Sequence, residues 1–369
     1  MNKPDLTEFG EKERRLCNFM DAYGYDAVLI GTVANFSWLS CGGSNQISWT
    51  TDYGCSVLLV TGKGKYCIAN TMDAKRLEEQ ELTGLGFEMI ALCWYEKSTA
   101  EAALDMVKGM RVLSDIPLPG VEYDFKKFYK LHYPLTDTEI ERYRIMGRES
   151  EEVLMTVADN TNPGMSGSDV ETMLITGFAG KKMQVVCMII GVDEEIRNYR
   201  HPIPWDKKIG KQLMMVLAVR RYGLHIPITR MVHFGEDVPA ETQKRFAAVC
   251  AIEANSMAAC KPGEKFCNIL DMQKRWYRET GFEDEWKNHF IGGITGYIPN
   301  DSSLCLDKEA TVMDGQTFNW FTTITGVNVE DTMIVSGGSR EVFTCTGLWP
   351  VKAYTAGLEA IELPQILIK

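Results

Sequence analysis

The sequence contains no long apolar run. No stretch of its 369 residues approaches the roughly 18 to 20 consecutive apolar residues that a membrane helix requires. The segment MNKPDLTEFGEKERRL at the N-terminus lacks the apolar core of a signal peptide and carries acidic side chains that a transit peptide avoids. We therefore expect a soluble protein with a cytoplasmic location and no membrane partner.

Closely spaced cysteines and clustered basic residues are also absent. The 11 cysteines are an odd number, and the closest two, Cys260 and Cys267, are seven positions apart. Neither a disulfide framework nor a CxxC zinc or redox motif is therefore expected. The 39 basic side chains are scattered and are outnumbered by 50 acidic ones, which gives a net charge of −11. A protein with this charge distribution is not expected to bind nucleic acid.

Several common catalytic motifs are missing. The sequence has no P-loop, no GxGxxG motif, no GxSxG elbow and no HExxH motif. Their absence excludes the commonest nucleotide, hydride-transfer, serine-hydrolase and zinc-protease sites.

The length and the hydrophobic pattern together predict two domains, because 369 residues exceed the size at which one core keeps growing. Residues 1–135 are expected to form a small α/β domain. Its predicted elements are a helix near Phe9–Tyr23 and strands at Ala27–Ile30, Ser56–Val60 and Lys65–Ala69. Thr136 and Glu139 then form a capping-box pattern in front of a helix that runs to about Asn160. Residues 136–369 are expected to form the second domain.

The second domain contains an internal repeat of one helix–turn–helix pattern. A long helix, Asn162-Pro163-Gly164 and another helix are followed 99 residues later by a long helix, Lys261-Pro262-Gly263 and another helix. Strands are expected after each helix pair, at Met183–Gly191, Lys211–Val219 and Ile226–Phe234 in the first half and at Thr317–Thr325 and Glu330–Val335 in the second. A sheet with helices on one face is an α+β arrangement.

Three segments of the second domain, IPITRMVHFG (226–235), HFIGGITG (289–296) and VEDT (329–332), resemble the creatinase, prolidase and Xaa-Pro aminopeptidase superfamily in order and spacing. That resemblance implies a C-terminal pita-bread domain with an internal pseudo-twofold repeat, preceded by a smaller creatinase-type α/β domain. The segment NFSWL (35–39) also resembles the second strand of the superfamily's smaller domain. The likeness covers nearly the whole chain.

The metallopeptidases of that superfamily hold two divalent metals with two aspartates, one histidine and two glutamates, a ligand set that suits manganese, cobalt or zinc. Carried over position by position, the aspartates fall on Val216 and Pro227, the histidine on Gly293 and the first glutamate on Phe321. Only the second glutamate remains, as Glu330. The resemblance therefore implies that no metal is bound here.

Other polar positions of the superfamily are retained. His201 matches the histidine that contacts substrate and that resembles the general acid/base of metal-free creatinase, so we expect His201 and Glu330 to be catalytic. Imidazole titrates near neutrality and transfers protons readily. The residues expected to bind substrate are His289, Arg230, Tyr297 and Phe321. The Arg230 guanidinium would bind a substrate carboxylate through two hydrogen bonds.

The resemblance implies a metal-independent hydrolase or lyase of creatinase type, without a cofactor, acting on a C–N bond of a small amidine, amide or amino-acid-like molecule. One alternative is a non-catalytic pita-bread protein that recognises a peptide or metabolite. Another is an Xaa-Pro dipeptidase, against which the missing ligands argue. A homodimer is also expected, because in this superfamily the small domain of one subunit covers the pocket of the other.

Overall fold

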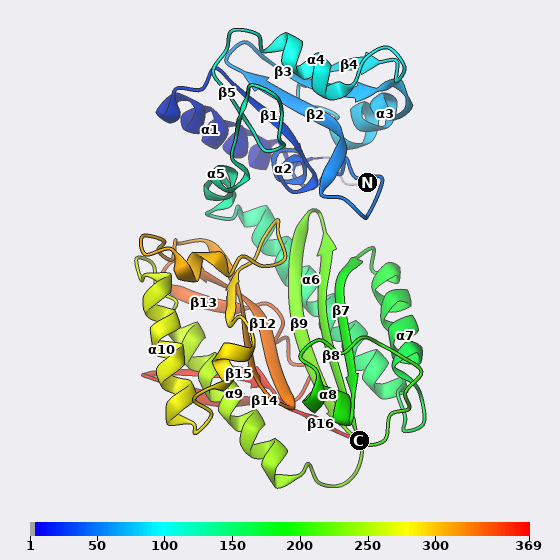
Figure 1. Cartoon of the computed structure of the whole chain (residues 1–369), viewed down its shortest axis with the longest axis vertical. Helices are drawn as coiled ribbons and strands as arrows, with labels where there is room; N and C mark the ends of the chain where they lie inside the picture. The colour runs from blue at the N-terminus through cyan, green and yellow to red at the C-terminus, as the bar shows by residue number, and fades with distance from the viewer. Residues whose placement is uncertain (1–3) are drawn as a thin grey trace. The chain divides into compact units, whose positions relative to one another are not determined.

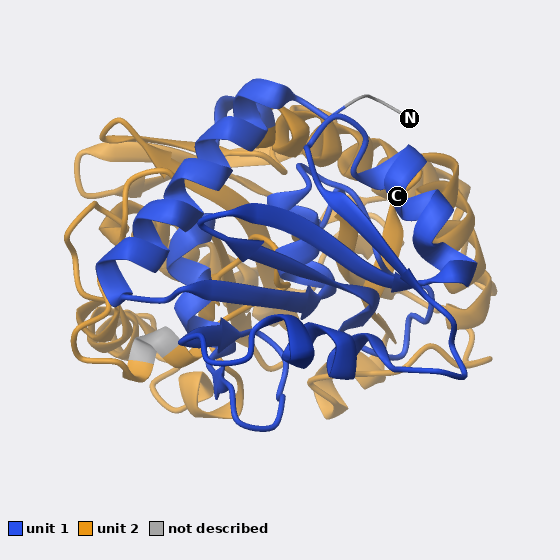
Figure 2. Ribbon diagram, turned by 90° about the horizontal axis from the view of Figure 1, so that it is seen from above, with its two compact units in different colours: residues 1–138, 222–224 blue, residues 139–221, 225–369 orange. Residues whose placement is uncertain are grey.

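The computed structural model describes residues 4–369, except for the side chains at positions 304 and 305. The chain divides into two compact units, residues 1–138 with 222–224 and residues 139–221 with 225–369 (Figure 2). The change of unit thus falls three residues after the boundary expected at 135/136. Among the described residues, no helix is long and apolar enough to cross a membrane.

Unit 1 is a six-stranded sheet with helices, in the strand order β4-β3-β2-β1-β5-β6. Its strands are β1 (Ala27–Thr32), β2 (Tyr53–Thr61), β3 (Gly64–Asn70), β4 (Glu88–Leu92), β5 (Val112–Ser114) and β6 (Glu122–Tyr123). Its helices are α1 (Leu6–Tyr23), α2 (Val33–Leu39), α3 (Thr71–Arg76), α4 (Thr99–Met106) and α5 (Phe125–Tyr129). The helix and the three strands predicted from apolar periodicity are all present.

One expectation for unit 1 is wrong, because the segment NFSWL (35–39) lies in helix α2 and not in a strand. The side chain of Thr32 accepts a hydrogen bond from the backbone N–H of Asn35 and so caps the helix. The buried carboxylate of Asp115 accepts from the backbone N–H groups of Gly31 and Thr32 and from the Asn35 side chain. These hydrogen bonds stabilise the first turn of helix α2 directly after β1.

Unit 2 is built on a larger sheet whose main path has the order β10-β11-β12-β9-β8-β7. Its strands are β7 (Gln184–Val192), β8 (Gln212–Arg221), β9 (Leu224–His233), β10 (Gly292–Ile294), β11 (Gln316–Ile324), β12 (Val327–Ser336), β13 (Ser339–Val342) and β16 (Leu367–Ile368), with a separate hairpin of β14 (Val351–Ala356) and β15 (Glu359–Pro364). Its helices are α6 (Asp137–Asn160), α7 (Gly167–Gly180), α8 (Glu194–Asn198), α9 (Ala240–Ala259) and α10 (Phe266–Glu279) (Figure 1). Helix α7 packs on β7, and α9 packs on β11 and β12.

The two halves of unit 2 repeat the same backbone pattern. Gly164 and Gly263, which follow the two prolines, have φ values of 92° and 90°, a region that favours glycine. Their N–H groups donate to the carbonyls of Ile209 and Val312, respectively. The strand order is also mirrored, since β9 of the first half pairs with β12 of the second at the middle of the sheet. These observations support the predicted pseudo-twofold repeat.

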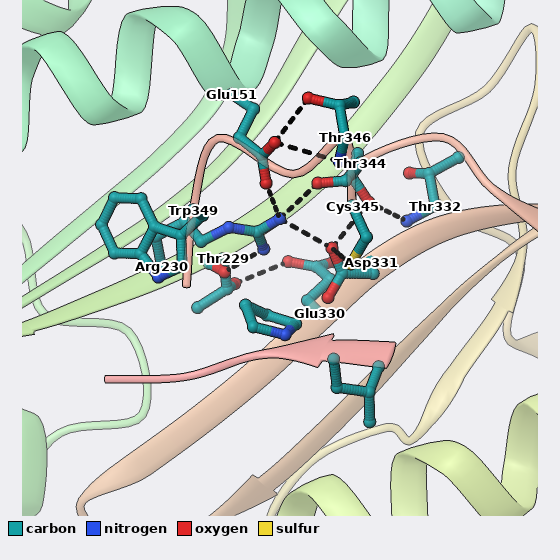
Figure 3. A network of polar contacts seen from close by, with 12 residues as sticks. Glu151, Thr229, Arg230, Glu330, Asp331, Thr332, Thr344, Cys345, Thr346 and Trp349 are labelled. Carbon is teal, nitrogen blue, oxygen red and sulfur yellow. Dashed lines mark hydrogen bonds and ion pairs between the residues drawn. The ribbon is translucent and has the colours of Figure 1, made fainter. Parts of the chain in front are cut away.

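A buried ion network lies on the helix-covered face of this sheet (Figure 3). The Arg230 guanidinium contacts Asp331 at 3.0 Å and Glu151 of α6 at 3.3 Å, and all three side chains are inaccessible to solvent. It also donates to the backbone carbonyl of Thr344. Glu151 in turn accepts from the backbone N–H of Thr346 at 3.0 Å. The network therefore ties α6, β9, β12 and the segment after β13 together.

The expectation that Arg230 binds a substrate carboxylate is wrong. Both of its charge partners come from the chain itself, and the side chain is inaccessible to solvent. Successive residues of a strand face opposite sides of the sheet. Arg230 therefore faces the helices while its neighbour Thr229 faces the other side, where it donates to Glu330.

We predict that Arg230→Met destabilises the protein by about 3–5 kcal/mol, because two buried carboxylates then lose their cation. Arg144→Met is the matched control, since Arg144 forms its ion pairs with Glu141 and Glu341 at the surface and such pairs contribute about 0–1 kcal/mol. Urea unfolding of both variants measures the difference. Equal stability of the two variants would contradict the structural role of Arg230.

Candidate active site

Glu330, which the resemblance matches to the superfamily's second glutamate ligand, lies in the middle of the large sheet. Glu330 of β12 lies opposite Thr229 of β9 and opposite Phe321 of β11, so these three side chains share one face of the sheet. The Glu330 carboxyl group accepts hydrogen bonds from the Asn319 amide and from the Thr229 hydroxyl, both at 2.9 Å. Asn319 and Thr229 were not identified from the sequence, although strand register would have placed them beside Glu330.

Burial controls the charge of Glu330. Removal from water raises the pKa of its carboxyl group to about 8, against the lowering effect of the hydrogen bonds from Asn319 and Thr229. The nearest cation, Arg230, is directed to the opposite face and is engaged by Asp331 and Glu151. Glu330 is therefore largely protonated at neutral pH.

The positions that hold metal in the superfamily do not offer a metal site here. Phe321 is buried beside Glu330, and Val216 pairs with Ile189 among apolar neighbours. A side chain at Gly293 has no room, because its Cβ would lie 2.4 Å from the backbone oxygen of Asp301. The space beside Gly293 is thus filled by backbone and is not open to a substrate group.

The donor chemistry leads to the same conclusion. Among the residues whose side chains the structure describes, no group of three or more His, Cys, Asp or Glu is arranged to hold a metal ion. Glu330 has only amide and hydroxyl neighbours in its hydrogen bonds. The residues present therefore do not fit the dinuclear centre that the fold implies, and no catalytic step is derived through it.

The side chains of His201 and His289, both predicted site residues, are in contact. The Nε2 atoms of His201 and His289 lie 2.9 Å apart, although the residues are 88 positions apart in the sequence. Arg200, the neighbour of His201, links its own loop to the segment before His289. Its guanidinium pairs with Glu285 and also donates to Thr325 at 3.0 Å. Arg200 was not singled out from the sequence, where only its neighbour His201 matched a known position.

The hydrogen bonds fix the direction of this imidazole pair. A carbonyl oxygen only accepts, so the contact between His289 Nδ1 and the Phe290 carbonyl requires the proton of neutral His289 to be on Nδ1. His289 Nε2 then accepts, and His201 Nε2 donates to it. His201 consequently carries its free lone pair on Nδ1, where a proton can be taken up.

His289 remains neutral near physiological pH. Its pKa is lowered to about 4, chiefly by burial, and the positive charge of nearby Arg200 acts in the same direction. Its ring packs against Phe290 and Phe321, with centroid distances of 4.2 and 4.4 Å. His289 is thus a fixed acceptor for the partly exposed His201, and Phe321 supports it.

The remaining predicted residue, Tyr297, is not positioned to bind substrate. Its ring is buried, and its hydroxyl donates to Glu139 of α6 at 2.5 Å. A small cavity beside His289 is instead lined by Phe321, Arg200 and Asn328. The Asn328 side-chain oxygen is buried and has no hydrogen-bond partner among the described residues, which makes it available to an N–H donor.

We predict that stability falls as pH rises because of Glu330. Between pH 4.5 and about 8 the unfolded chain releases the Glu330 proton while the folded protein retains it, so unfolding is favoured by up to about 1.4 kcal/mol per pH unit. Glu330→Gln should reduce the loss of melting temperature from pH 5 to pH 8. Exposed Glu236→Gln is the control and should keep the wild-type slope; an unchanged slope in Glu330→Gln would contradict the raised pKa.

Comparison with known proteins places this site in a family. The model of metallopeptidase family M24 matches residues 141–337, more than half of the chain. An Xaa-Pro dipeptidase from Pyrococcus horikoshii is 21% identical over 363 residues, which cover 91% of this chain and 97% of that protein.

Two solved structures share the fold over nearly the whole chain. An Xaa-Pro dipeptidase from Bacillus anthracis has a TM-score of 0.75 at 17% identity, covering 98% of this chain and all of that one. The dipeptidase PepE from Mycobacterium ulcerans has a TM-score of 0.77 at 12% identity, covering all of this chain and 99% of that one. The pita-bread fold expected from the sequence is thereby confirmed, and the chain belongs to metallopeptidase family M24.

Proposed function

We propose that this M24 protein hydrolyses a C–N bond of a small amide, amidine or dipeptide without a metal centre, and that His201 transfers the proton. The imidazole pair is the observation that carries this proposal, because His289 leaves His201 with one free lone pair on a partly exposed ring. The dipeptidases that resemble the chain act on such a bond, which favours an amide or short peptide as the substrate class.

The proposed step uses water as the nucleophile. His201 Nδ1 takes a proton from water as its oxygen attacks the carbon of the C–N bond. The resulting imidazolium is stabilised by its Nε2–H donation to neutral His289. The proton then passes from Nδ1 to the departing nitrogen, the C–N bond breaks, and His201 returns to its neutral form. His289 acts in this scheme as a positioning residue.

The catalytic role expected for Glu330 stays a prediction, which rests on its place on the same sheet face as Phe321, the residue that packs on His289. The hydrogen-bond partners of Glu330 are Asn319 and Thr229, and among the described side chains no hydrogen bond joins it to His201 or His289. It therefore does not serve as the orienting carboxylate of His201. The homodimer expected from the resemblance stays a prediction, which light scattering at micromolar concentration tests.

A non-catalytic binding protein is the second candidate. It is favoured by the close packing at the former ligand positions, where Phe321 and the backbone at Asp301 fill space. A binding protein needs the cavity and its polar groups but no proton transfer. Turnover in the presence of a chelator separates it from the first candidate.

We predict that His201→Ala lowers turnover by about 10²- to 10⁴-fold, the usual contribution of a positioned acid/base. A panel of Xaa-Pro dipeptides, other dipeptides and small amidines is assayed with EDTA and, separately, with added manganese. Ile203→Ala is the matched control, because Ile203 is exposed in the same loop. It should keep wild-type turnover.

The alternatives give different results in that assay. Activity that appears only with manganese, together with stoichiometric bound metal, would overturn the metal-free proposal in favour of an Xaa-Pro dipeptidase. Binding of a panel member without turnover under either condition would favour the non-catalytic candidate. Activity in EDTA that is unchanged in His201→Ala would remove the proposed role of His201.

A further inference from the structure

A second, larger cavity is also lined by His289. This side pocket has a volume of about 410 Å³ and is lined chiefly by Leu270, Trp286, His289, Phe290, Ile291 and Ser302. Leu270 comes from helix α10, and the other five come from the segment around β10. All of these residues belong to unit 2.

The side pocket is suited to an apolar group. Trp286, Phe290, Ile291 and Leu270 supply aromatic and aliphatic surface, and Phe290 remains 46% exposed. The nearby cations are already paired, Lys274 with Asp271 at 2.9 Å and Lys287 with Asp284 at 2.5 Å. A ligand charge would therefore find no uncompensated partner among these groups, whereas an apolar side chain would cover exposed aromatic surface.

The size of the side pocket limits the group that it takes. A cavity of roughly 150 Å³ accommodates a benzene ring, and ligand pockets usually span about 300–1,000 Å³. About 410 Å³ is thus enough for one ring-sized side chain with part of its backbone, but not for a folded partner.

His289 connects the side pocket to the proposed chemistry. His289 is one of the residues that line the side pocket, and its Nε2 contacts His201. A group held in the side pocket would lie beside the residue that orients the proton-transferring histidine. We propose that the side pocket binds an aromatic or large aliphatic side chain of the substrate, next to the bond that is cleaved. This inference rests on the proposed function for the identity of the ligand as substrate.

The test measures binding of two probes, N-acetyl-phenylalaninamide and N-acetylglycinamide, to the full chain by calorimetry. We expect the phenylalanine probe to bind at least about tenfold more tightly, as burial of an aromatic side chain predicts. Leu270→Trp, which fills the side pocket, should abolish this preference. The control is Ile145→Trp, placed on the exposed surface of α6, which should preserve it.

A second variant guards against misfolding of the first. Trp286→Ala removes aromatic surface instead of adding volume, and it should weaken the phenylalanine probe without changing the glycine probe. Equal binding of the two probes to the wild-type protein, or an unchanged preference in Leu270→Trp and Trp286→Ala, would overturn the proposal.

The catalytic proposal is tested separately by His201→Ala. That variant should retain the preference for the phenylalanine probe, because His201 does not line the side pocket. If the wild-type protein prefers the phenylalanine probe but shows no turnover, the side-pocket proposal is supported and the catalytic proposal is contradicted. Turnover without preference removes only the side pocket.

Discussion

Where β9 pairs with β12, the alternation of side chains decides which polar groups face each side of the large sheet of unit 2. Thr229 and Glu330 face one side of the sheet, and their neighbours Arg230 and Asp331 face the other. One side therefore receives a neutral carboxyl group with hydroxyl and amide partners. The other receives a buried ion pair that joins the sheet to α6. On each strand, adjacent residues therefore belong to different groups: one side chain faces the candidate site, and the next belongs to the buried ion network.

The network that holds the sheet to α6 is separate from the face that carries Glu330. The buried cation and carboxylates that hold β9, β12 and α6 together lie on the helix-covered face. Substitutions at Val216, Gly293 and Phe321 concern the opposite face and leave that network untouched. Phe321, which shares the face of Glu330, packs on His289 and so supports the imidazole pair.

Much of the fold was predictable because its signals are local or repeated. The strand patterns, the long helix to Asn160 and the 99-residue repeat all correspond to observed elements. The NFSWL segment was misassigned because its helix depends on Asp115, which lies far away in the sequence. The site was less predictable. Arg230 was assigned by its proximity to the motif without regard to strand alternation, and Tyr297 was assigned as an aromatic residue at a position that lines the pocket in the superfamily.

The account of the site depends on a hydrogen bond that His201 Nε2 donates to neutral His289. A long-range ¹⁵N–¹H spectrum of the histidine rings at pH 7 tests it most directly. We expect His289 to be uncharged with its proton on Nδ1, and His201 to carry a proton on Nε2. A His289 ring protonated on Nε2, or on both nitrogens, would contradict the account.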